Sequence, residues 1–410
     1  MELKFDADAS LKKQYSTFIR QLSGWSGSGT VPELAGLDLS RALELQRQHW
    51  QSLGLKVDYK FKRAKNHSSD IPSFSYNDRV FVNTFIGDNR QLVTNISSGG
   101  RTLYDRTDDV GVTVVVQELR KGVQPSPDMP VCCPHCGAPS KFMRLLNGCP
   151  YCDTHVLMDD LYPRVTNCFL DNHSDNKNRN LWEIPVFIAA GIAMIYFILT
   201  VVFEQSLTDG SVAPSAVVVS GIFLGFVMMG IRKVCSVIGK MGKDLRGTGK
   251  VGRSLFFRHK IKKIDPEFSS EYFRDRAMHL LRMMAYSKDP SVYTACECQR
   301  PKSWQTVLDA SLHNFGIDRY RIRGNECTVT LTLYTDCLIY HKGKIRPKAK
   351  KFRMTLRKVI TAPTDLGFSV RAVSCPSCGA SFDAEQVRNC PFCGHEYDLA
   401  RHDWVLTDIR

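Results

Sequence analysis

The sequence lacks the residue sets that mark the common catalytic machineries. It has no phosphate-binding glycine loop, no Ser/His/Asp set and no pair of carboxylates at a spacing typical of acid–base catalysis. His279, His313, Asp336 and His341 are catalytic candidates by residue type only, and positions on a helix surface or strand edge explain them more simply. We therefore predict a protein that is not an enzyme and that has neither catalytic residues nor an organic cofactor. The alternative is an enzyme that uses an apolar pocket.

The first residues also lack the apolar core of a cleavable signal peptide. Met1–Ser10 is polar and acidic. The chain has fifteen cysteines, and eight of them form four Cys-x-x-Cys pairs. Because disulfides are rare where thiols are kept reduced, this usage together with the missing signal favours a cytosolic setting for the cysteines.

Two segments in the middle lack charge altogether. Residues 184–203 and 212–231 are 20 residues each, and as helices they would reach roughly 30 Å, the thickness of the apolar layer of a bilayer. The loop between them, Glu204–Ser211, holds no Lys or Arg. These features predict an antiparallel transmembrane hairpin in the cell (plasma or inner) membrane, with both termini in the cytosol.

Most of the excess positive charge follows this hairpin. The chain has a formal charge of +14, and Arg232–Lys263 holds eleven Lys and Arg residues against the single acid Asp244. A polybasic strip beside a bilayer is explained by anionic headgroups, so it predicts contact with anionic lipid and no nucleic-acid partner. A strip that only fixes the membrane topology is an equally good explanation.

The soluble parts carry an internal repeat. An amphipathic helical pattern opens the chain, a second helix is expected at about 38–53, and the alternation of Leu55–Phe61 predicts a strand. The first helical pattern returns 262 positions later: Leu11, Tyr15, Phe18, Ile19 and Leu22 become Phe273, Ala277, Leu280, Leu281 and Met284. Gly316 follows Gly54 by the same interval, at an expected junction from helix to strand. We therefore expect a duplicated α+β domain.

Each copy contains two Cys-x-x-Cys knuckles. The first set is Cys133, Cys136, Cys149 and Cys152, and the second is Cys375, Cys378, Cys390 and Cys393. Two facing knuckles supply four thiolates in a tetrahedron, as in structural zinc sites, so two structural zinc ions are predicted. With four protein ligands, neither ion keeps an open position for catalysis. Cys132, His135, His155 and His395 are spare donors near these sites, and Cys296 and Cys298 are expected to be ordinary thiols.

The second half resembles a known family. The junction Gly316-Ile317-Asp318-Arg319-Tyr320, the Cys-Pro-x-Cys-Gly insert and the final Asp403-Trp404-Val405-Leu406 are similar to bacterial Tim-forty-four-like domain proteins. The resemblance implies the cone-shaped α+β fold of the nuclear-transport-factor-two-like superfamily, with helices on a curved sheet around an apolar pocket. It also implies that the domain binds proteins, peptides or lipids at a membrane surface.

These observations together predict a membrane-anchored binding or scaffold protein. The expected organisation is a first copy at 1–170 with a zinc ribbon at 133–152, a linker at 171–183, the membrane hairpin, the basic strip at 232–263, and a second copy at 264–410 with a ribbon at 375–393. Its partner is expected to be a protein, peptide or lipid at the inner leaflet. Nucleic-acid binding by the ribbons is a further alternative, but neither ribbon has the basic and aromatic density that it needs.

Overall fold

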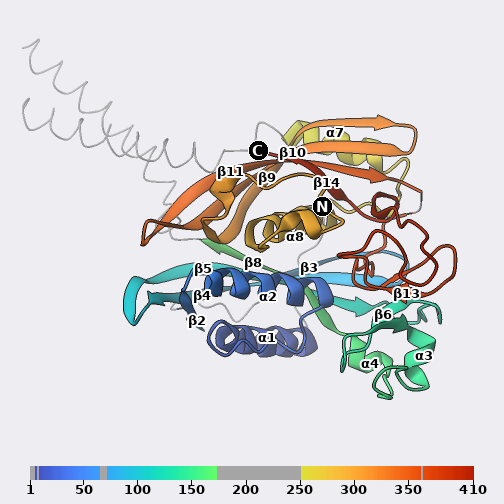
Figure 1. Ribbon diagram of the computed structural model, residues 1–410, viewed down its shortest axis with the longest axis horizontal. Coiled ribbons are helices and arrows are strands. Elements are labelled where there is room, and N and C mark those ends of the chain that lie inside the picture. Colours follow the sequence, from blue (N-terminus) through green and yellow to red (C-terminus); the bar gives the residue numbers. More distant parts are fainter. Residues whose placement is uncertain (1–4, 7–8, 65–71, 173–250, 362) are drawn as a thin grey trace, which may run out of the picture. The chain divides into compact units, whose positions relative to one another are not determined.

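Two antiparallel sheets with the same strand order dominate the computed structural model, which describes residues 5–6, 9–64, 72–172, 251–361 and 363–410 (Figure 1). By contacts, Met1–His173 and Lys250–Arg410 form one unit, and a second unit, Ser174–Gly249, lies outside the described residues. Both predicted copies therefore belong to the same unit. Its class is α+β.

The first sheet is built from the N-terminal half. Its strands are β1 (Phe5–Asp6), β2 (Lys56–Arg63), β3 (Pro72–Asn77), β4 (Phe81–Ser98), β5 (Arg101–Leu119) and β8 (Arg164–Asn172). β2 and β3 pair with different parts of β4, so that together they form one border of it. The order across the sheet is therefore β2/β3, β4, β5, β8.

The second sheet repeats this order. Its strands are β9 (Val307–Arg323), β10 (Glu326–His341), β11 (Lys344–Val359) and β14 (Val405–Ile409), in the order β9, β10, β11, β14. In both halves a small two-stranded ribbon precedes the last strand: β6 (Pro130–Cys132) with β7 (Pro139–Lys141), and β12 (Val373–Ser374) with β13 (Ser381–Phe382). The tight turn from β10 to β11 uses Lys342 and Gly343, both with positive φ, as a two-residue hairpin loop requires.

Four longer helices cover the sheets. They are α1 (Ala9–Ser28), α2 (Leu37–Ser52), α7 (Val251–Ile261) and α8 (Ser270–Tyr286). α8 begins at a true N-cap, because the Ser269 hydroxyl accepts a hydrogen bond from the Tyr272 backbone N–H at 3.2 Å. The shorter elements are α3 (Phe142–Leu146), α4 (Met158–Leu161), η3 (Pro290–Val292), η4 (Lys302–Trp304) and η5 (Leu399–Arg401).

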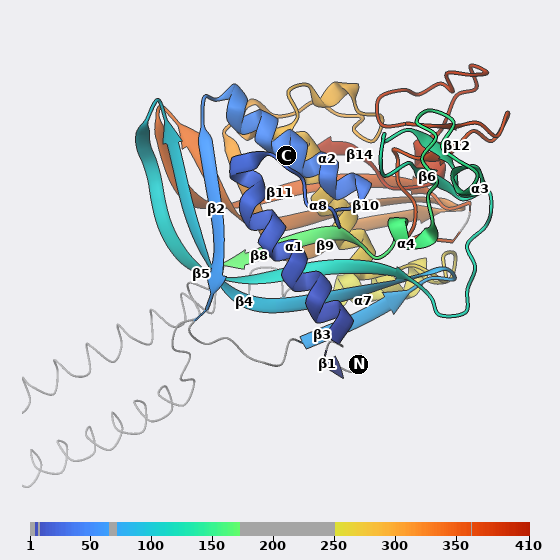
Figure 2. The ribbon, with the colours of Figure 1, turned by 90° about the horizontal axis from the view of Figure 1, so that it is seen from below.

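Alternation along β5 places one core on each face of the first sheet. Val112, Val114 and Val116 belong to the cluster that α1 covers, whereas Val115 belongs to the cluster that contains α8. Figure 2 shows α1 crossing the strands of this sheet. α1 and α8 therefore lie on opposite faces of the first sheet.

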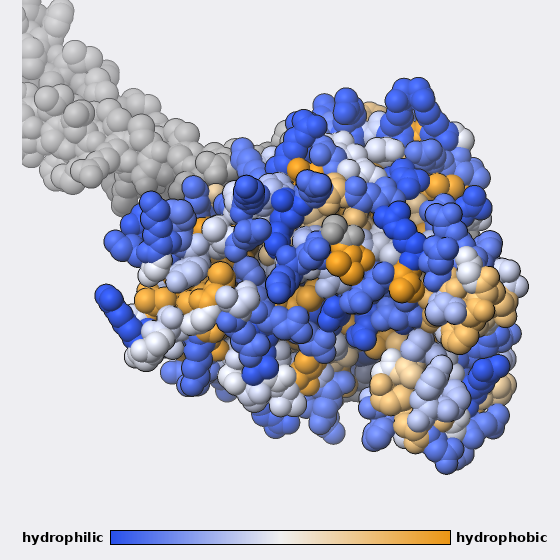
Figure 3. Space-filling model, in the orientation of Figure 1, coloured by the Kyte–Doolittle hydropathy of each residue, from blue (hydrophilic) through white to orange (hydrophobic). Residues whose placement is uncertain are grey.

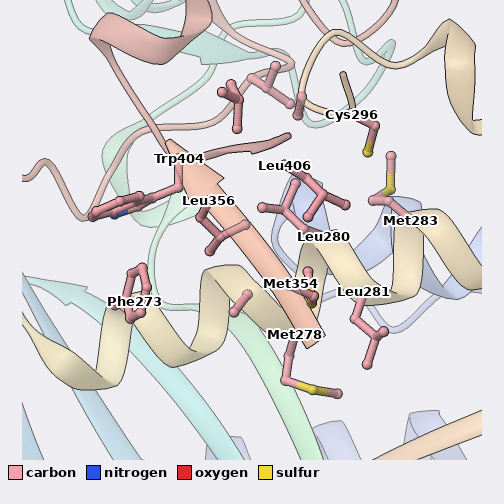
Figure 4. Packing of buried hydrophobic residues seen from close by; sticks show 14 of the residues in the cluster. Phe273, Met278, Leu280, Leu281, Met283, Cys296, Met354, Leu356, Trp404 and Leu406 are labelled. Atoms are coloured by element: carbon pink, nitrogen blue, oxygen red, sulfur yellow. The ribbon is translucent and has the colours of Figure 1, made fainter. Parts of the chain in front are cut away.

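α8 is buried between the two sheets. The Arg274 guanidinium lies 5.2 Å from the ring centroids of Phe85 and Phe169 in the first sheet. On its other side, Phe273 packs edge-on against Trp404, just before β14, with ring centroids 4.7 Å apart (Figure 4). α2 joins the halves as well, since the Trp50 indole N–H donates to the Leu308 carbonyl at 2.9 Å.

Several expected elements have different bounds. The Gly/Ser-rich residues that follow Trp25 are still part of α1, which continues to Ser28. Gly316 lies inside β9, and the preceding helix ends at Tyr286, so the expected junction from helix to strand is not there. A register shift in the β9–β10 pairing occurs beside it, between the pairs Thr330–Arg319 and Leu331–Ile317, which is a common role for glycine in a strand.

The structure corrects the predicted location in the cell membrane. Within the described ranges, no helix is long and apolar enough to cross a bilayer. The helices found there are amphipathic and pack on sheets, as α1 does. The segments 184–203 and 212–231, on which the prediction rested, lie outside the described residues, as does the basic strip before residue 251.

Candidate functional site

The eight predicted cysteine ligands form two compact clusters. In each cluster the four sulfur atoms lie within 4.8 Å of one another. The Sγ atoms of Cys133 and Cys152 are 3.7 Å apart, and those of Cys375 and Cys393 are 3.6 Å apart. A disulfide would bring two sulfurs to about 2.05 Å, whereas a tetrahedral zinc with bonds of about 2.3 Å separates them by roughly 3.8 Å. The spacing fits four ligands of one metal ion.

The backbone turns in the same way at each knuckle. At the first, the Cys133 N–H donates to the Ala138 carbonyl and the Gly137 N–H donates to the Cys133 carbonyl, at 2.9 and 2.8 Å. The other three knuckles repeat this pair of bonds. The residue after the second cysteine has a positive φ each time, and it is glycine at three of the four: Gly137, Gly379 and Gly394.

At the remaining knuckle, which Cys149 and Cys152 form, Asp153 takes this position with a φ of 58°. A residue with a side chain is strained in the left-handed region, which glycine adopts at little cost. We expect Asp153→Gly to raise the free energy of unfolding by about 0.5–1 kcal/mol, measured by urea unfolding of the metal-loaded protein. The matched change Ala138→Gly, one residue beyond a knuckle glycine, should destabilise the protein. Equal effects of the two changes would contradict this account.

In each cluster one thiol is shifted towards the thiolate form that binds metal, whereas desolvation and the hydrogen bonds shared with the other sulfurs raise the pKa of a second one, Cys136 or Cys378, to about 12. The Thr154 hydroxyl beside the Cys152 sulfur lowers the pKa of that thiol to about 5, and the Cys378 backbone N–H lowers the pKa of Cys375 to about 6. Thiolates are the ligands of zinc. The residues present therefore fit a metal ion, and their four sulfurs leave no open coordination position.

The two ribbons lie side by side. β6 contacts β12 and β7 contacts β13, although the two modules are about 240 residues apart in sequence. Cys132 is part of this junction: it is buried, and its thiol lies 3.5 Å from the Arg371 carbonyl of the second module. Burial raises the pKa of Cys132 to about 12. Cys132 is therefore a packed thiol at the junction and does not join the cluster of its neighbour Cys133.

The other spare donors stay outside both clusters. His135, His155 and His395 are exposed, and the His155 Nδ1 lies 3.0 Å from the Leu146 carbonyl oxygen. Cys296 and Cys298 are free cysteines, as expected, and burial raises the pKa of Cys296 to about 12.

The four catalytic candidates lie on three elements and do not form one site. His279 is on α8 and lines a cavity of about 70 Å³. Asp336 is on β10 and lines a different cavity of about 60 Å³. His313 on β9 and His341 at the end of β10 are exposed. Only His279 is therefore placed beside the buried charged groups described next.

Sequence reasoning missed a buried ion cluster that joins the halves. The Arg276 guanidinium lies between Asp403, 2.5 Å from its Nε, and Asp38, 3.2 Å from its Nη1. Asp403 is 1% exposed and Asp38 is 24% exposed, and the Ser369 hydroxyl donates to Asp38 at 2.8 Å. No local signal marked it, because Arg274, Asp275 and His279 also stand around Arg276 and α8 has the pattern of an ordinary amphipathic helix.

Comparison with known proteins identifies no relative: no family model matches the chain, no curated protein matches it, and no solved structure matches it.

Proposed function

We propose that the chain is a non-catalytic binding protein whose paired zinc ribbons present apolar side chains to a protein partner. The observation that carries this proposal is the exposure of large apolar residues on the ribbons. Tyr151 is 64% exposed and Phe392 is 63% exposed. They occupy equivalent positions, since each lies between the two cysteines of the second knuckle in its module.

The exposed apolar residues are concentrated in these modules. Eight large hydrophobic side chains of the described residues are exposed. Four of them belong to the ribbons (Met143, Tyr151, Val387 and Phe392), and a fifth, Leu157, follows the first ribbon directly. Figure 3 shows apolar residues at the end of the molecule where β6 and β13 lie in Figure 1. Aromatic residues on a rigid support are typical anchors of protein interfaces.

A metal ion would serve this role by fixing the knuckles. The ribbons have few regular hydrogen bonds, since β12 and β13 are two residues each. Zinc binding would hold Tyr151 and Phe392 in place before a partner arrives, which reduces the entropy lost on binding. Because all four positions of the ion are filled by sulfur, the metal chemistry supports binding and not catalysis.

The proposal also includes a finer view of the fold. Each half contains a long helix against an antiparallel sheet, of six strands in the first half and four in the second, with a ribbon before the last strand. This arrangement supports two nuclear-transport-factor-two-like domains related to Tim-forty-four-like proteins. That resemblance implies a protein, a peptide or a lipid as the partner, and the exposed aromatic residues favour a protein or peptide.

The test compares two double variants of the tagged full-length chain. Tyr151→Ser with Phe392→Ser should reduce the recovery of specific, cross-linked partner proteins at least tenfold, because truncating interface anchors costs more than about 1 kcal/mol each. Leu255→Ser with Phe256→Ser is the control, since these α7 residues are also exposed, at 60% and 69%. Quantitative mass spectrometry of the cross-linked complexes gives the readout, and zinc content verifies the ribbons.

Unchanged recovery with the ribbon variant at full zinc content would refute the proposal. So would an equal loss with the α7 variant, because binding would then follow exposed apolar surface in general.

A further inference from the structure

A stripe of polar residues follows one side of the buried helix α8. Tyr272, Asp275, Arg276 and His279 are spaced i, i+3, i+4 and i+7, so they share a helix face. All four line the cavity of about 70 Å³. Polar side chains on a buried helix need partners, because desolvating them without hydrogen bonds costs free energy. The stripe therefore marks a place where partners are required.

Both halves of the chain build the walls of this cavity. Asp38 comes from the first turn of α2, Asn83 from β4 and Asn167 from β8, while Leu366 and Phe368 come from the segment after β11. The cavity is partly open to solvent. A ligand could therefore enter, and it would contact residues of both repeats at once.

Three buried atoms of the stripe make no hydrogen bond among the described residues: Nε and Nη2 of Arg276, and Oδ1 of Asp275. Of the two Arg276 atoms, Nε still has a carboxylate beside it, because it forms an ion pair with Asp403. Arg276 uses Nε and Nη1 for its two carboxylates, and the closest cation to Asp275 Oδ1 is the Arg274 Nη2, at 3.6 Å. Arg276 is 5% exposed and Asp275 is 8% exposed, so bulk water does not satisfy them freely. The cavity thus offers one unused donor group and one unused acceptor.

The charges around the cavity disfavour a charged ligand. An anion at Arg276 would lie beside Asp38 and Asp403, which already share this guanidinium. A cation at Asp275 would meet Arg276 and Arg164, which both line the cavity. Burial raises the pKa of Asp275 to about 7 and lowers the pKa of His279 to about 4, so at neutral pH His279 is uncharged and Asp275 is divided between its charged and neutral forms. A neutral ligand that both accepts and donates a hydrogen bond fits best.

The volume restricts what can be enclosed. A cavity of about 150 Å³ holds a benzene molecule, so about 70 Å³ holds a group of roughly half that size. A carboxamide has this size, and it carries an acceptor and a donor on neighbouring atoms. Leu366 and Phe368 line the same cavity and offer apolar contact to the rest of the ligand.

We propose that this cavity binds the carboxamide group of a small neutral molecule, which accepts from Arg276 Nη2 and donates to Asp275 Oδ1. The site is independent of the zinc ribbons and of their partner. It would make the junction of the two repeats a ligand-binding site.

Three probes of the same shape test the ligand class. Benzamide, benzoate and benzylamine are neutral, anionic and cationic at pH 7, and their binding to the full-length, metal-loaded chain can be followed by saturation-transfer NMR. We expect benzamide to bind with a dissociation constant on the order of 1 mM and at least tenfold more tightly than either charged probe. Binding of benzoate or benzylamine as tight as that of benzamide would overturn the proposal. The proposal would also fail if benzamide showed no saturable binding at concentrations up to roughly 20 times that dissociation constant.

A variant then tests the position. Asp275→Leu keeps the branched shape of the side chain and removes both oxygens, so benzamide binding should weaken at least tenfold. Asp336→Leu is the matched control, because it makes the same change in another cavity. Thermal unfolding verifies that both variants fold. Unchanged benzamide binding in Asp275→Leu would place the probe elsewhere and reject this site; if that variant does not fold, the three-probe comparison on the unmodified chain still decides.

Discussion

Replacing Cys375 and Cys378 by Ser is expected to lower the zinc content of the purified chain from two ions to one. Two ligands of the second cluster would be lost, and the remaining Cys390 and Cys393 cannot hold a structural zinc alone. Because metal binding and folding are coupled in such sites, the second ribbon should lose its fixed structure. Elemental analysis measures the first effect.

The same variant should destabilise the whole unit by at least about 3 kcal/mol, since loss of a structural metal belongs to the most damaging changes. Val373 and Phe382 of this ribbon are buried in the same cluster as α8, and the ribbon also supports β6 and β7 of the first module. Urea unfolding gives the free energy. Cys298→Ser is the control, because Cys298 is a free cysteine outside both clusters. The clusters would not be structural zinc sites if the double variant still held two zinc ions or kept its stability. The same conclusion would follow if the chain contained iron in place of zinc.

Arg276→Met is expected to be the most damaging single change at the junction of the two halves of the chain. It leaves the carboxylates of Asp403 and Asp38 without their cation, and removing one partner of a buried ion pair costs about 3–5 kcal/mol. Most of the loss should come from Asp403, which is 1% exposed, because Asp38 at 24% exposure keeps some contact with solvent. Urea unfolding at pH 7 measures it.

The pH dependence distinguishes lost charge pairing from lost packing. Burial would raise the pKa of Asp38, but His279, Arg276 and Ser369 together lower it. A lowered pKa in the folded state adds stability above the ordinary value, which is lost as pH falls through the folded pKa. Burial raises the pKa of Asp403 despite Arg276, so Asp403 favours the folded state at low pH and this contribution is lost as pH rises through its folded pKa.

Without Arg276 both carboxylates should bind protons at higher pH, so the loss should shrink as the pH falls from 7 towards 4. Adding Asp38→Asn and Asp403→Asn to the variant should recover most of the stability at pH 7, since no unpaired charge remains. A loss that is the same at both pH values, or that the two added changes do not reduce, would assign the effect to packing.

The sequence could predict the part of the site whose residues lie close together along the chain. All eight cysteines of the two clusters were identified, because a knuckle is a pattern of a few residues and its geometry follows from that pattern. The ion cluster could not be identified in this way. Asp38 and Arg276 are 238 positions apart, and no local period connects them.

The fold shows the same division between local and distant information. Helices α1, α2 and α8 follow from their apolar period, and so does the mixed α+β class. β3 and the part of β9 before Gly316 were not expected as strands, and Gly316 was taken as a junction from helix to strand because it follows Gly54 by 262 positions. These segments form strands because they pair with β4 and β10. This pairing cannot be predicted from the β propensity of the segments themselves.

The position of α8 between the two sheets has a consequence for biosynthesis. Phe85 and Phe169 of the first sheet are covered by a helix that ends at Tyr286, and Phe85 leaves the ribosome about 200 residues earlier. At about 5–20 residues per second, this apolar face has no cover from α8 for roughly 10–40 s. The newly made first half is therefore the species most exposed to aggregation, and its protection depends on how soon the second half follows.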